Sequence, residues 1–214
     1  MRVVILGTGT SVGKTFVTAA LAAACRSRGS VLALKPIETG VLEGAPGDAG
    51  TIAEAAGHSP VLSRWRFERG VSPHLAAREQ GESIDIGQVA GWVWEHEQRL
   101  APAVTLVESA GGAFTPLGPR ATNVDLASSL APALWLLVAP DALGVLHDVG
   151  AALRALPRPP DAVVLSAARP VDASSGSNAA ELKRLGICKV MQVLAAGSRD
   201  VSGLAAWLTG LPKS

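Results

Sequence analysis

The stretch Gly7-Thr8-Gly9-Thr10-Ser11-Val12-Gly13-Lys14-Thr15 decides how this chain folds. It directly follows the apolar run 3–6 and directly precedes a helical pattern. An apolar strand, a glycine-rich turn and a helix that opens with Gly-Lys-Thr are the parts of a phosphate-binding P-loop, in the order that this motif requires. The sequence therefore predicts a loop that grips a nucleoside triphosphate.

The residue types of this loop explain how it would hold phosphate. Glycines let backbone N–H groups close around phosphate oxygens, and the start of the helix adds a partial positive charge. Lys14 would reach the β- and γ-phosphate oxygens, and the hydroxyl of Thr15 would ligate Mg²⁺. We assign nucleotide binding to the loop and the helix start, namely Gly9, Thr10, Ser11, Val12, Gly13, Lys14 and Thr15.

One departure from the usual G-x-x-x-x-G-K-[ST] pattern is visible. The pattern places a glycine at position 8, where this chain has Thr8, and the first glycine stands one residue earlier, at Gly7. The alternative is a chance glycine-rich turn with an exposed lysine. The strand before the loop and the helix after it disfavour that alternative.

Composition limits the classes of function. Of the 214 residues, 48% are hydrophobic and 17% are charged, which indicates a filled globular core and argues against disorder. The net charge is +1, so neither nucleic acid nor a membrane surface is an expected partner. We find no stretch long enough to span a membrane and no signal sequence before the first strand, and we expect one cytoplasmic domain over residues 1–214.

The order of the patterns predicts the fold class. Apolar runs at 3–6, 31–34, 104–107, 133–138, 162–165 and 190–194 alternate with helical patterns at 16–28, 51–56, 86–100, 143–156 and 178–185. We expect an α/β fold of the P-loop NTPase type, a mainly parallel doubly wound sheet of about six to seven strands with helices on both faces. Residues 41–50 read as a loop that carries Asp48, and residues 57–82 as an irregular lid or substrate loop.

Polar clusters follow three of the expected strands. In a doubly wound sheet, ligands bind outside the carboxyl ends of the strands. The P-loop follows the first expected strand, Lys35 follows the second, and Glu108 follows the central one. Glu108 is the first candidate ligand for Mg²⁺, with an N-cap or a strand-end ion pair as the alternative. Asp48 is the second candidate, with a solvated loop residue as the alternative. Lys35 would neutralise an anionic substrate, unless it is an ordinary surface lysine, and we expect both Lys14 and Lys35 to be exposed at the site.

Four motifs together resemble the dethiobiotin synthetase family: GTGTSVGKT at 7–15, KPIETG at 35–40, SPH at 72–74 and VESAGGAFTPL at 107–117. The resemblance covers about the first 150 residues, and the remainder is similar only in architecture. It implies an ATP-dependent ligase of biotin biosynthesis. In that reaction CO₂ adds to one amine of 7,8-diaminopelargonic acid, the γ-phosphate of ATP moves to the carbamate, and the second amine displaces phosphate to close a cyclic urea.

The resemblance also implies roles for individual residues. Lys14, Lys35 and Thr10 would be catalytic, and Thr15, Asp48 and Glu108 would hold Mg²⁺. Glu108 and Gly111 would also lie against the nucleotide. Members of the family are homodimers in which the segment matching 143–147 binds the substrate in the neighbouring subunit. The implied substrate-binding residues are Lys35, Thr39, Gly111, Gly112, Gly144, Val145 and Leu146.

The chain departs from the family pattern at a few positions. Gly9, Ser11 and Ser109 stand where the family commonly has Asp, an acidic residue and Gly. Ser166-Ala167-Ala168 stands where the family often has an asparagine that reads adenine. A serine offers one hydroxyl where an asparagine pairs bidentately, so we expect loose nucleotide selectivity.

Two other classes of P-loop protein are alternatives. An amide ligase of the cobyrinate type would need an additional glutaminase domain, for which 214 residues leave no room. A nucleotide-switch ATPase would carry an extra lysine early in the P-loop, where Gly9 and Thr10 stand, and often a basic or amphipathic tail, whereas 204–214 is weakly charged.

Overall fold

The strand that leads into the P-loop lies in the middle of the fold. A computed structural model describes residues 1–210, and its first strand is β1 (Arg2–Gly7). Val3 and Ile5 of β1 are buried in one apolar cluster, and Val4 and Leu6 are buried in another. Since successive side chains of a strand point to opposite faces, this pattern requires a sheet that is covered on both sides.

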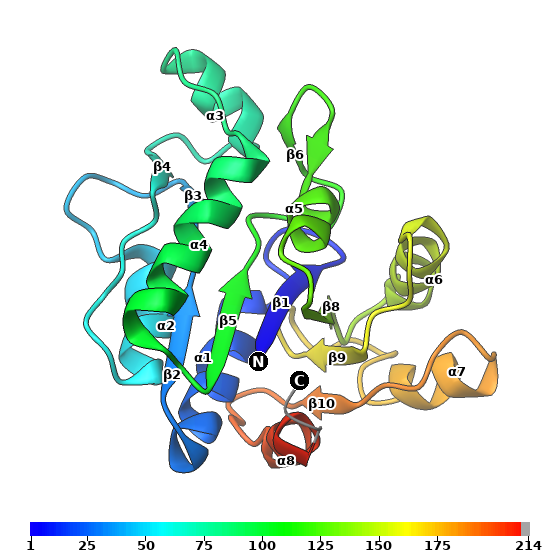
Figure 1. The fold of residues 1–214 in the computed structure, drawn as a ribbon. Coiled ribbons are helices and arrows are strands. Elements are labelled where there is room, and N and C mark those ends of the chain that lie inside the picture. Colours follow the sequence, from blue (N-terminus) through cyan, green and yellow to red (C-terminus); the bar gives the residue numbers. More distant parts are fainter. Residues whose placement is uncertain (211–214) are drawn as a thin grey trace.

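The main sheet confirms the expected fold class. Within residues 1–210 it has six strands in the order β10-β9-β8-β1-β5-β2, and every neighbouring pair is parallel (Figure 1). The strands besides β1 are β2 (Val31–Leu34), β5 (Val104–Glu108), β8 (Leu134–Pro140), β9 (Ala162–Ser166) and β10 (Gln192–Leu194). All carboxyl ends therefore lie along one edge, with the P-loop near its centre.

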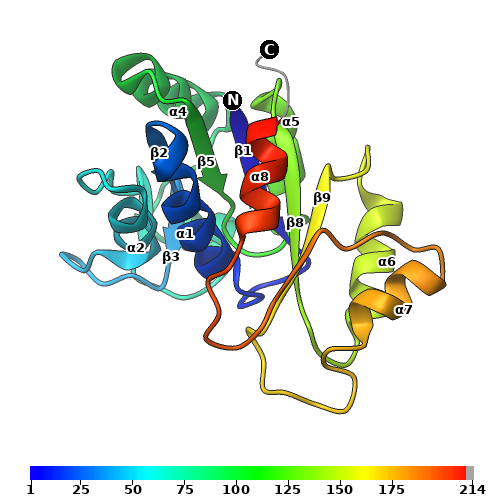
Figure 2. The same cartoon turned by 90° about the horizontal axis from the view of Figure 1, so that it is seen from below.

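Helices cover the two faces of this sheet. One face carries α1 (Lys14–Cys25), α2 (Gly47–Ala56) and α8 (Ser202–Gly210), and α1 and α8 lie side by side there (Figure 2). The other face carries α4 (Ile86–Leu100), α5 (Asn123–Ser129) and α6 (Val145–Ala155), and α7 (Asn178–Arg184) packs against α6. The expected helix at 16–28 is α1 followed by the short 3₁₀ helix η1 (Arg26–Arg28).

The prediction of a loop over residues 41–50 is wrong at its end. Helix α2 begins at Gly47, so Asp48 lies in its first turn and not in a loop. Pro46, Gly47 and Gly50 have low helix propensity, which is why the sequence pattern favours a loop. The helix starts early because a side chain from another element accepts hydrogen bonds from its first N–H groups, as described below.

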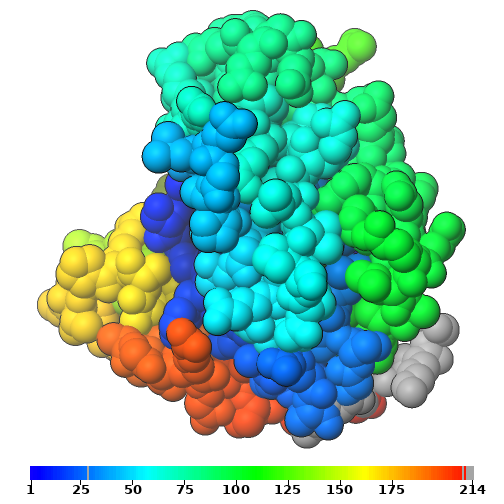
Figure 3. Space-filling model, turned by 90° about the vertical axis from the view of Figure 1, so that its left-hand side faces the viewer, coloured from blue at the N-terminus to red at the C-terminus, as the bar shows by residue number. Residues whose placement is uncertain are grey.

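Residues 57–82 are more regular than expected. The short strands β3 (Ile37–Thr39) and β4 (Trp65–Phe67) pair in parallel, and α3 (Pro73–Glu79) follows them. Figure 3 shows the segment between β2 and α4 covering one side of the molecule. Strands of three residues that pair across 25 or more residues of chain leave no periodic signal, so only the tertiary structure reveals them.

The sequence patterns do not predict four further elements. The strands β6 (Pro116–Gly118) and β7 (Ala121–Thr122) form an antiparallel hairpin, and α5 follows them, started by a capping box of Thr122 and Asp125. The fourth is α8, where the sequence indicates only a weakly charged tail; residues 211–214 of that tail lie outside the described part. Among residues 1–210, no helix combines the length and the apolar composition that crossing a membrane requires.

Candidate functional site

A cavity of about 380 Å³ opens at the carboxyl edge of the sheet, beside the P-loop. It brings together most of the residues that the sequence singled out: Thr10, Ser11, Val12, Gly13, Lys14, Thr15, Lys35, Thr39, Asp48, Glu108 and Gly111. These residues come from the loop after β1 and the start of α1, from the segment between the end of β2 and the first turn of α2, and from the end of β5 with the turn after it. The strand ends therefore converge as the parallel sheet predicts.

The P-loop itself is built around a left-handed glycine. Gly13 has φ 87° at the N-cap of α1, and a Cβ there would stand 2.5 Å from the hydroxyl oxygen of Ser166. Only glycine fits both the conformation and the space. The ammonium of Lys14 donates to the carbonyl of Gly9 at 3.1 Å. The ammonium group therefore lies against the loop that is expected to bind phosphate.

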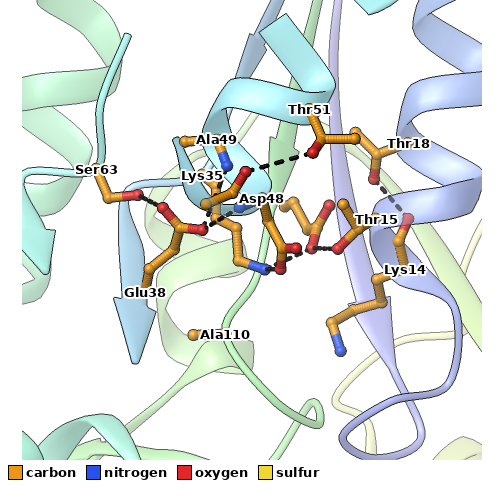
Figure 4. A network of polar contacts seen from close by, with 12 residues as sticks. Lys14, Thr15, Thr18, Lys35, Glu38, Asp48, Ala49, Thr51, Ser63 and Ala110 are labelled. Atoms are coloured by element: carbon orange, nitrogen blue, oxygen red, sulfur yellow. Dashed lines mark hydrogen bonds and ion pairs between the residues drawn. The ribbon is translucent and has the colours of Figure 1, made fainter. Parts of the chain in front are cut away.

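The strand register places Lys35 beside Glu108. Leu34, the last residue of β2, is paired with Val107 of β5. Lys35 directly follows β2, and Glu108 is the last residue of β5. The Lys35 ammonium lies 2.8 Å from Oε1 of Glu108. It also forms an ion pair with Asp48, whose side chain Figure 4 shows beside it. The Thr15 hydroxyl donates to the same Glu108 oxygen at 2.7 Å. One network thus joins the start of α1, the ends of β2 and β5, and the first turn of α2.

The expectation that both lysines are exposed is wrong. Lys14 and Lys35 are 6% and 7% exposed, because their aliphatic stems are enclosed by the elements around the cavity. Burial by itself would lower the pKa of Lys35, but the carboxylates of Glu108 and Asp48 outweigh burial and raise that pKa. For Lys14 burial dominates and lowers the pKa to about 8, and the nearby charge of Lys35 acts in the same direction.

The donor atoms at this edge fit a magnesium ion. Oε2 of Glu108 is buried and, among the described residues, has no hydrogen-bond partner. Asp48 supplies a second carboxylate and Thr15 a hydroxyl on the same network. Mg²⁺ is commonly bound by one or two carboxylates, with substrate phosphates and water as its other ligands. Oxygen donors beside a phosphate-binding loop satisfy that preference.

Three groups of predicted residues do not line this cavity. Gly9 is the first, and its carbonyl accepts the hydrogen bond from Lys14. Gly112 donates its N–H to Thr115 and accepts from Asn123, and a Cβ at Gly112 would come 3.1 Å from Cα of Gly9. The missing side chain at Gly112 thus lets the turn after β5 pack closely against the P-loop. Gly144, Val145 and Leu146 lie at the start of α6, after β8, and do not line the cavity of their own chain.

A smaller hollow of about 210 Å³ adjoins the P-loop on the side of β9. Its lining consists mainly of small residues: Gly13, Phe16, Ser166, Ala167, Ala168, Ala195, Ala196 and Gly197. The hydroxyl of Ser166 donates to the carbonyl of Val12 at 2.6 Å. This hydrogen bond therefore holds the P-loop against the end of β9.

Comparison with known proteins identifies the family. A family model described as an AAA domain matches residues 1–198. The ATP-dependent dethiobiotin synthetase of Anaeromyxobacter dehalogenans is 36% identical over 191 residues, which are 85% of this chain and 83% of that protein. The chain belongs to the dethiobiotin synthetase family. The dethiobiotin synthetase of Gloeobacter violaceus is 35% identical over 225 residues, covering 98% of this chain and 93% of that protein.

Solved structures agree on the fold. The signal recognition particle receptor FtsY of Elizabethkingia anophelis superposes with a TM-score of 0.64 at 14% identity, covering 93% of this chain and 60% of FtsY. A likeness at this identity shows a shared P-loop NTPase architecture and nothing about the reaction. The dethiobiotin synthetase relatives carry the functional information, and they are ATP-dependent ligases.

The sequence patterns assign no role to two residues around this cavity. Glu38 lies within the motif 35–40 but received no role, although it lines the cavity and is 2% exposed. Asn123 is fully buried and donates to the carbonyls of Ala110 and Gly112, which fixes the turn after β5. The signal available for Glu38 was a charged residue amid the apolar and turn residues of a strand end. For Asn123 the sequence offered none, because its partners are more than ten residues away.

Proposed function

We propose that this protein catalyses ATP-dependent dethiobiotin synthesis in the cavity between the P-loop and the ends of β2 and β5. The substrates are 7,8-diaminopelargonic acid, CO₂ and ATP, and the products are dethiobiotin, ADP and phosphate. The observation that carries the proposal is the convergence of Lys14, Lys35, Asp48 and Glu108, drawn from four separate segments, on one cavity. The dethiobiotin synthetase relatives support the choice of reaction.

The reaction needs three bond-forming steps. An amine nitrogen of the substrate bonds to the carbon of CO₂ and loses a proton, which yields a carbamate. A carbamate oxygen then takes the γ-phosphoryl group of ATP and ADP leaves, which gives a carbamic-phosphoric anhydride. Finally the second amine attacks the carbonyl carbon and loses a proton as phosphate leaves, which closes the cyclic urea.

The side chains position groups and balance charge in these steps. Lys14 binds the β- and γ-phosphate oxygens, and Lys35 faces the carbamate and the transferring phosphoryl group. Thr10, Ser11, Thr39 and Gly111 all line the cavity. In this proposal Thr10 and Ser11 serve the phosphate groups, and Thr39 and Gly111 serve the substrate. Little acid–base chemistry by side chains is required, because phosphoryl transfer depends mainly on positioning and charge neutralisation.

Thr15, Asp48 and Glu108 would hold the Mg²⁺ that accompanies ATP. When bound, this ion neutralises negative charge on the phosphate oxygens. The ion pairs of Lys35 with Asp48 and Glu108 hold the two carboxylates in place on either side of its ammonium. The same lysine thereby organises the acidic ligands and presents a positive charge to the substrate.

We further propose a cytoplasmic homodimer of single-domain chains in which the start of α6 reaches the site of the neighbouring subunit. Gly144, Val145 and Leu146 would contact the substrate there. Leu143, just before them, is 78% exposed at the start of this helix, and an exposed large apolar side chain beside a proposed contact fits burial by a second copy. Light scattering of the purified protein tests the dimer.

The central test follows phosphate release from MgATP and bicarbonate with and without 7,8-diaminopelargonic acid, while mass spectrometry detects the cyclic urea. We expect phosphate release and dethiobiotin formation in equal amounts, both dependent on the diamine. The matched control is Glu54→Gln, an exposed carboxylate on the outer side of α2, which should keep full activity. ATP hydrolysis that ignores the diamine would overturn the reaction and return the switch ATPase to consideration.

A further inference from the structure

Glu38 is a buried carboxylate whose two oxygens hold other parts of the protein. Its Oε1 accepts hydrogen bonds from the backbone N–H groups of Asp48 at 2.6 Å and Ala49 at 3.3 Å. Its Oε2 accepts from the hydroxyl of Ser63 at 2.5 Å. Figure 4 shows this carboxylate between Ser63 on one side and the first turn of α2 on the other.

Helix α2 needs this carboxylate because its own N-cap cannot supply an acceptor. The first N–H groups of a helix have no partner within the helix, and an N-cap side chain normally accepts from the second or third of them. Pro46 holds the N-cap position of α2 and has no side-chain oxygen. Asp48 and Ala49 are the second and third residues of α2, so Glu38 accepts at the two positions that an N-cap side chain would serve.

The cap fixes a residue of the site. The backbone N–H of Asp48 is held by Glu38, and its side chain is paired with Lys35, which in turn contacts Glu108. Both oxygens of Glu38 are engaged within the protein, so this carboxylate acts on the site through Asp48. A negative charge at the start of α2 also complements the helix dipole.

We propose that Glu38 is a positioning residue: by capping α2 from β3 it holds the Asp48 carboxylate in the place where it binds Mg²⁺. The proposal rests on the proposed function, since that function gives Asp48 its task. The close packing supports it, because a Cβ on Gly47 would come 2.7 Å from Oε1 of Glu38. The glycine at the start of α2 thus lets the carboxylate approach the helix.

The test compares Glu38→Ala, Glu38→Gln and Ser63→Ala, with Glu54→Gln as the control on the same helix. Glutamine keeps one oxygen for the α2 amides, and the Ser63 hydroxyl can turn to accept from its NH₂ group. We expect Glu38→Ala to raise the Mg²⁺ concentration for half-maximal activity by about 10-fold or more, as loss of a group that orients a metal ligand typically does. Glu38→Gln should keep this Mg²⁺ concentration close to the wild-type value, and Ser63→Ala should raise it less than Glu38→Ala does.

Two readouts separate positioning from general destabilisation. Hydrogen exchange of the amides of residues 48 and 49, measured without ligands, should accelerate in Glu38→Ala and stay protected in Glu38→Gln. In the Asp48→Asn background, Glu38→Ala should add less than about threefold to the Mg²⁺ requirement, because the two residues act on one ligand. Should Glu38→Ala fail to fold, Glu38→Met carries the same comparison, because methionine keeps most of the side-chain volume and removes both acceptor oxygens.

The outcomes decide between the claims. Unchanged exchange at residues 48 and 49 in Glu38→Ala, or a Mg²⁺ effect fully additive to that of Asp48→Asn, would overturn the positioning role. If the wild-type protein forms no cyclic urea, the proposed function fails, whereas the exchange experiment and Mg²⁺-dependent ATP binding still test the cap. The two failures are therefore distinguishable.

Discussion

The ammonium nitrogen of Lys35 lies 2.8 Å from Oε1 of Glu108, at the ends of two adjacent parallel strands. Glu108 is 1% exposed, so Lys35 provides the charge that makes an ionised carboxylate tolerable at this depth. Burial by itself would lower the pKa of Lys35, but the carboxylates of Glu108 and Asp48 raise it above its ordinary value of 10.5. Its contribution to stability is therefore complete at neutral pH and is lost only as the pH rises through the raised pKa.

Replacing Lys35 by alanine should consequently damage both activity and stability. We expect kcat/KM to fall by about 100-fold or more, and the free energy of unfolding to fall by about 3 kcal/mol, because a buried carboxylate loses its partner. Urea unfolding and steady-state kinetics measure the two effects. The double variant Lys35→Ala/Glu108→Gln should regain stability but no activity, and a fully stable Lys35→Ala protein would contradict this account of the pair.

The parts of the site that could be predicted from sequence are those that follow long apolar strands. Lys35 and Glu108 stand directly after such strands, and parallel pairing brings those ends to one edge. The sequence predicts Asp48 as a candidate ligand but also predicts a loop around it, because Pro46 and Gly47 weaken the helical pattern and the capping carboxylate lies ten residues earlier in the sequence. Local patterns carry no information on such a tertiary cap.

Lys14 should behave in the opposite way to Lys35. Burial lowers the pKa of Lys14 to about 8, so its charged form is less favourable in the folded protein than in the unfolded chain. Between about pH 8 and the ordinary lysine pKa of 10.5, the unfolded chain binds more protons at Lys14 than the folded protein does, so the contribution of Lys14 to stability improves as the pH rises. Lys14→Met should therefore show an equal or higher Tm at pH 7, while losing nucleotide binding.

The same pKa predicts how ATP affinity depends on pH. An anionic ligand binds the ammonium form of Lys14, so affinity should be constant below about pH 8 and should weaken by up to about tenfold per pH unit above it. Calorimetric titration with MgATP from about pH 7 to pH 9.5 measures this. The control is Lys14→Met, for which affinity should be weak and independent of pH in this range. Wild-type affinity that does not change above pH 8 would argue against a lysine with a lowered pKa in the phosphate site.

Asp48→Asn should alter the magnesium requirement more than stability. The Asp48 side chain is 47% exposed, and asparagine keeps an oxygen that can accept from Lys35. We expect the Mg²⁺ concentration for half-maximal activity to rise by about 10-fold to 100-fold, as loss of a ligand charge predicts, with a Tm close to that of the parent protein. A magnesium titration of activity measures the shift, and Glu54→Gln on the same helix serves as the matched variant. An unchanged magnesium requirement would remove Asp48 from the ligand set.

The hollow beside β9 predicts weak selection among nucleotide bases. In the part of the chain that the structure describes, the side chains lining this hollow are apolar apart from Ser166. The Ser166 hydroxyl already donates a hydrogen bond to the carbonyl of Val12. A base seated there meets no side-chain amide that could pair with its edge, and such a bidentate pair is worth about 1–3 kcal/mol of discrimination. We expect kcat/KM for ATP, CTP and GTP to agree within about tenfold, measured as diamine-dependent phosphate release. Ala168→Asn, at the exposed rim of the hollow, would place an amide beside the base and should widen these ratios. A preference for ATP above about 100-fold in the wild-type protein would show that another group reads the base.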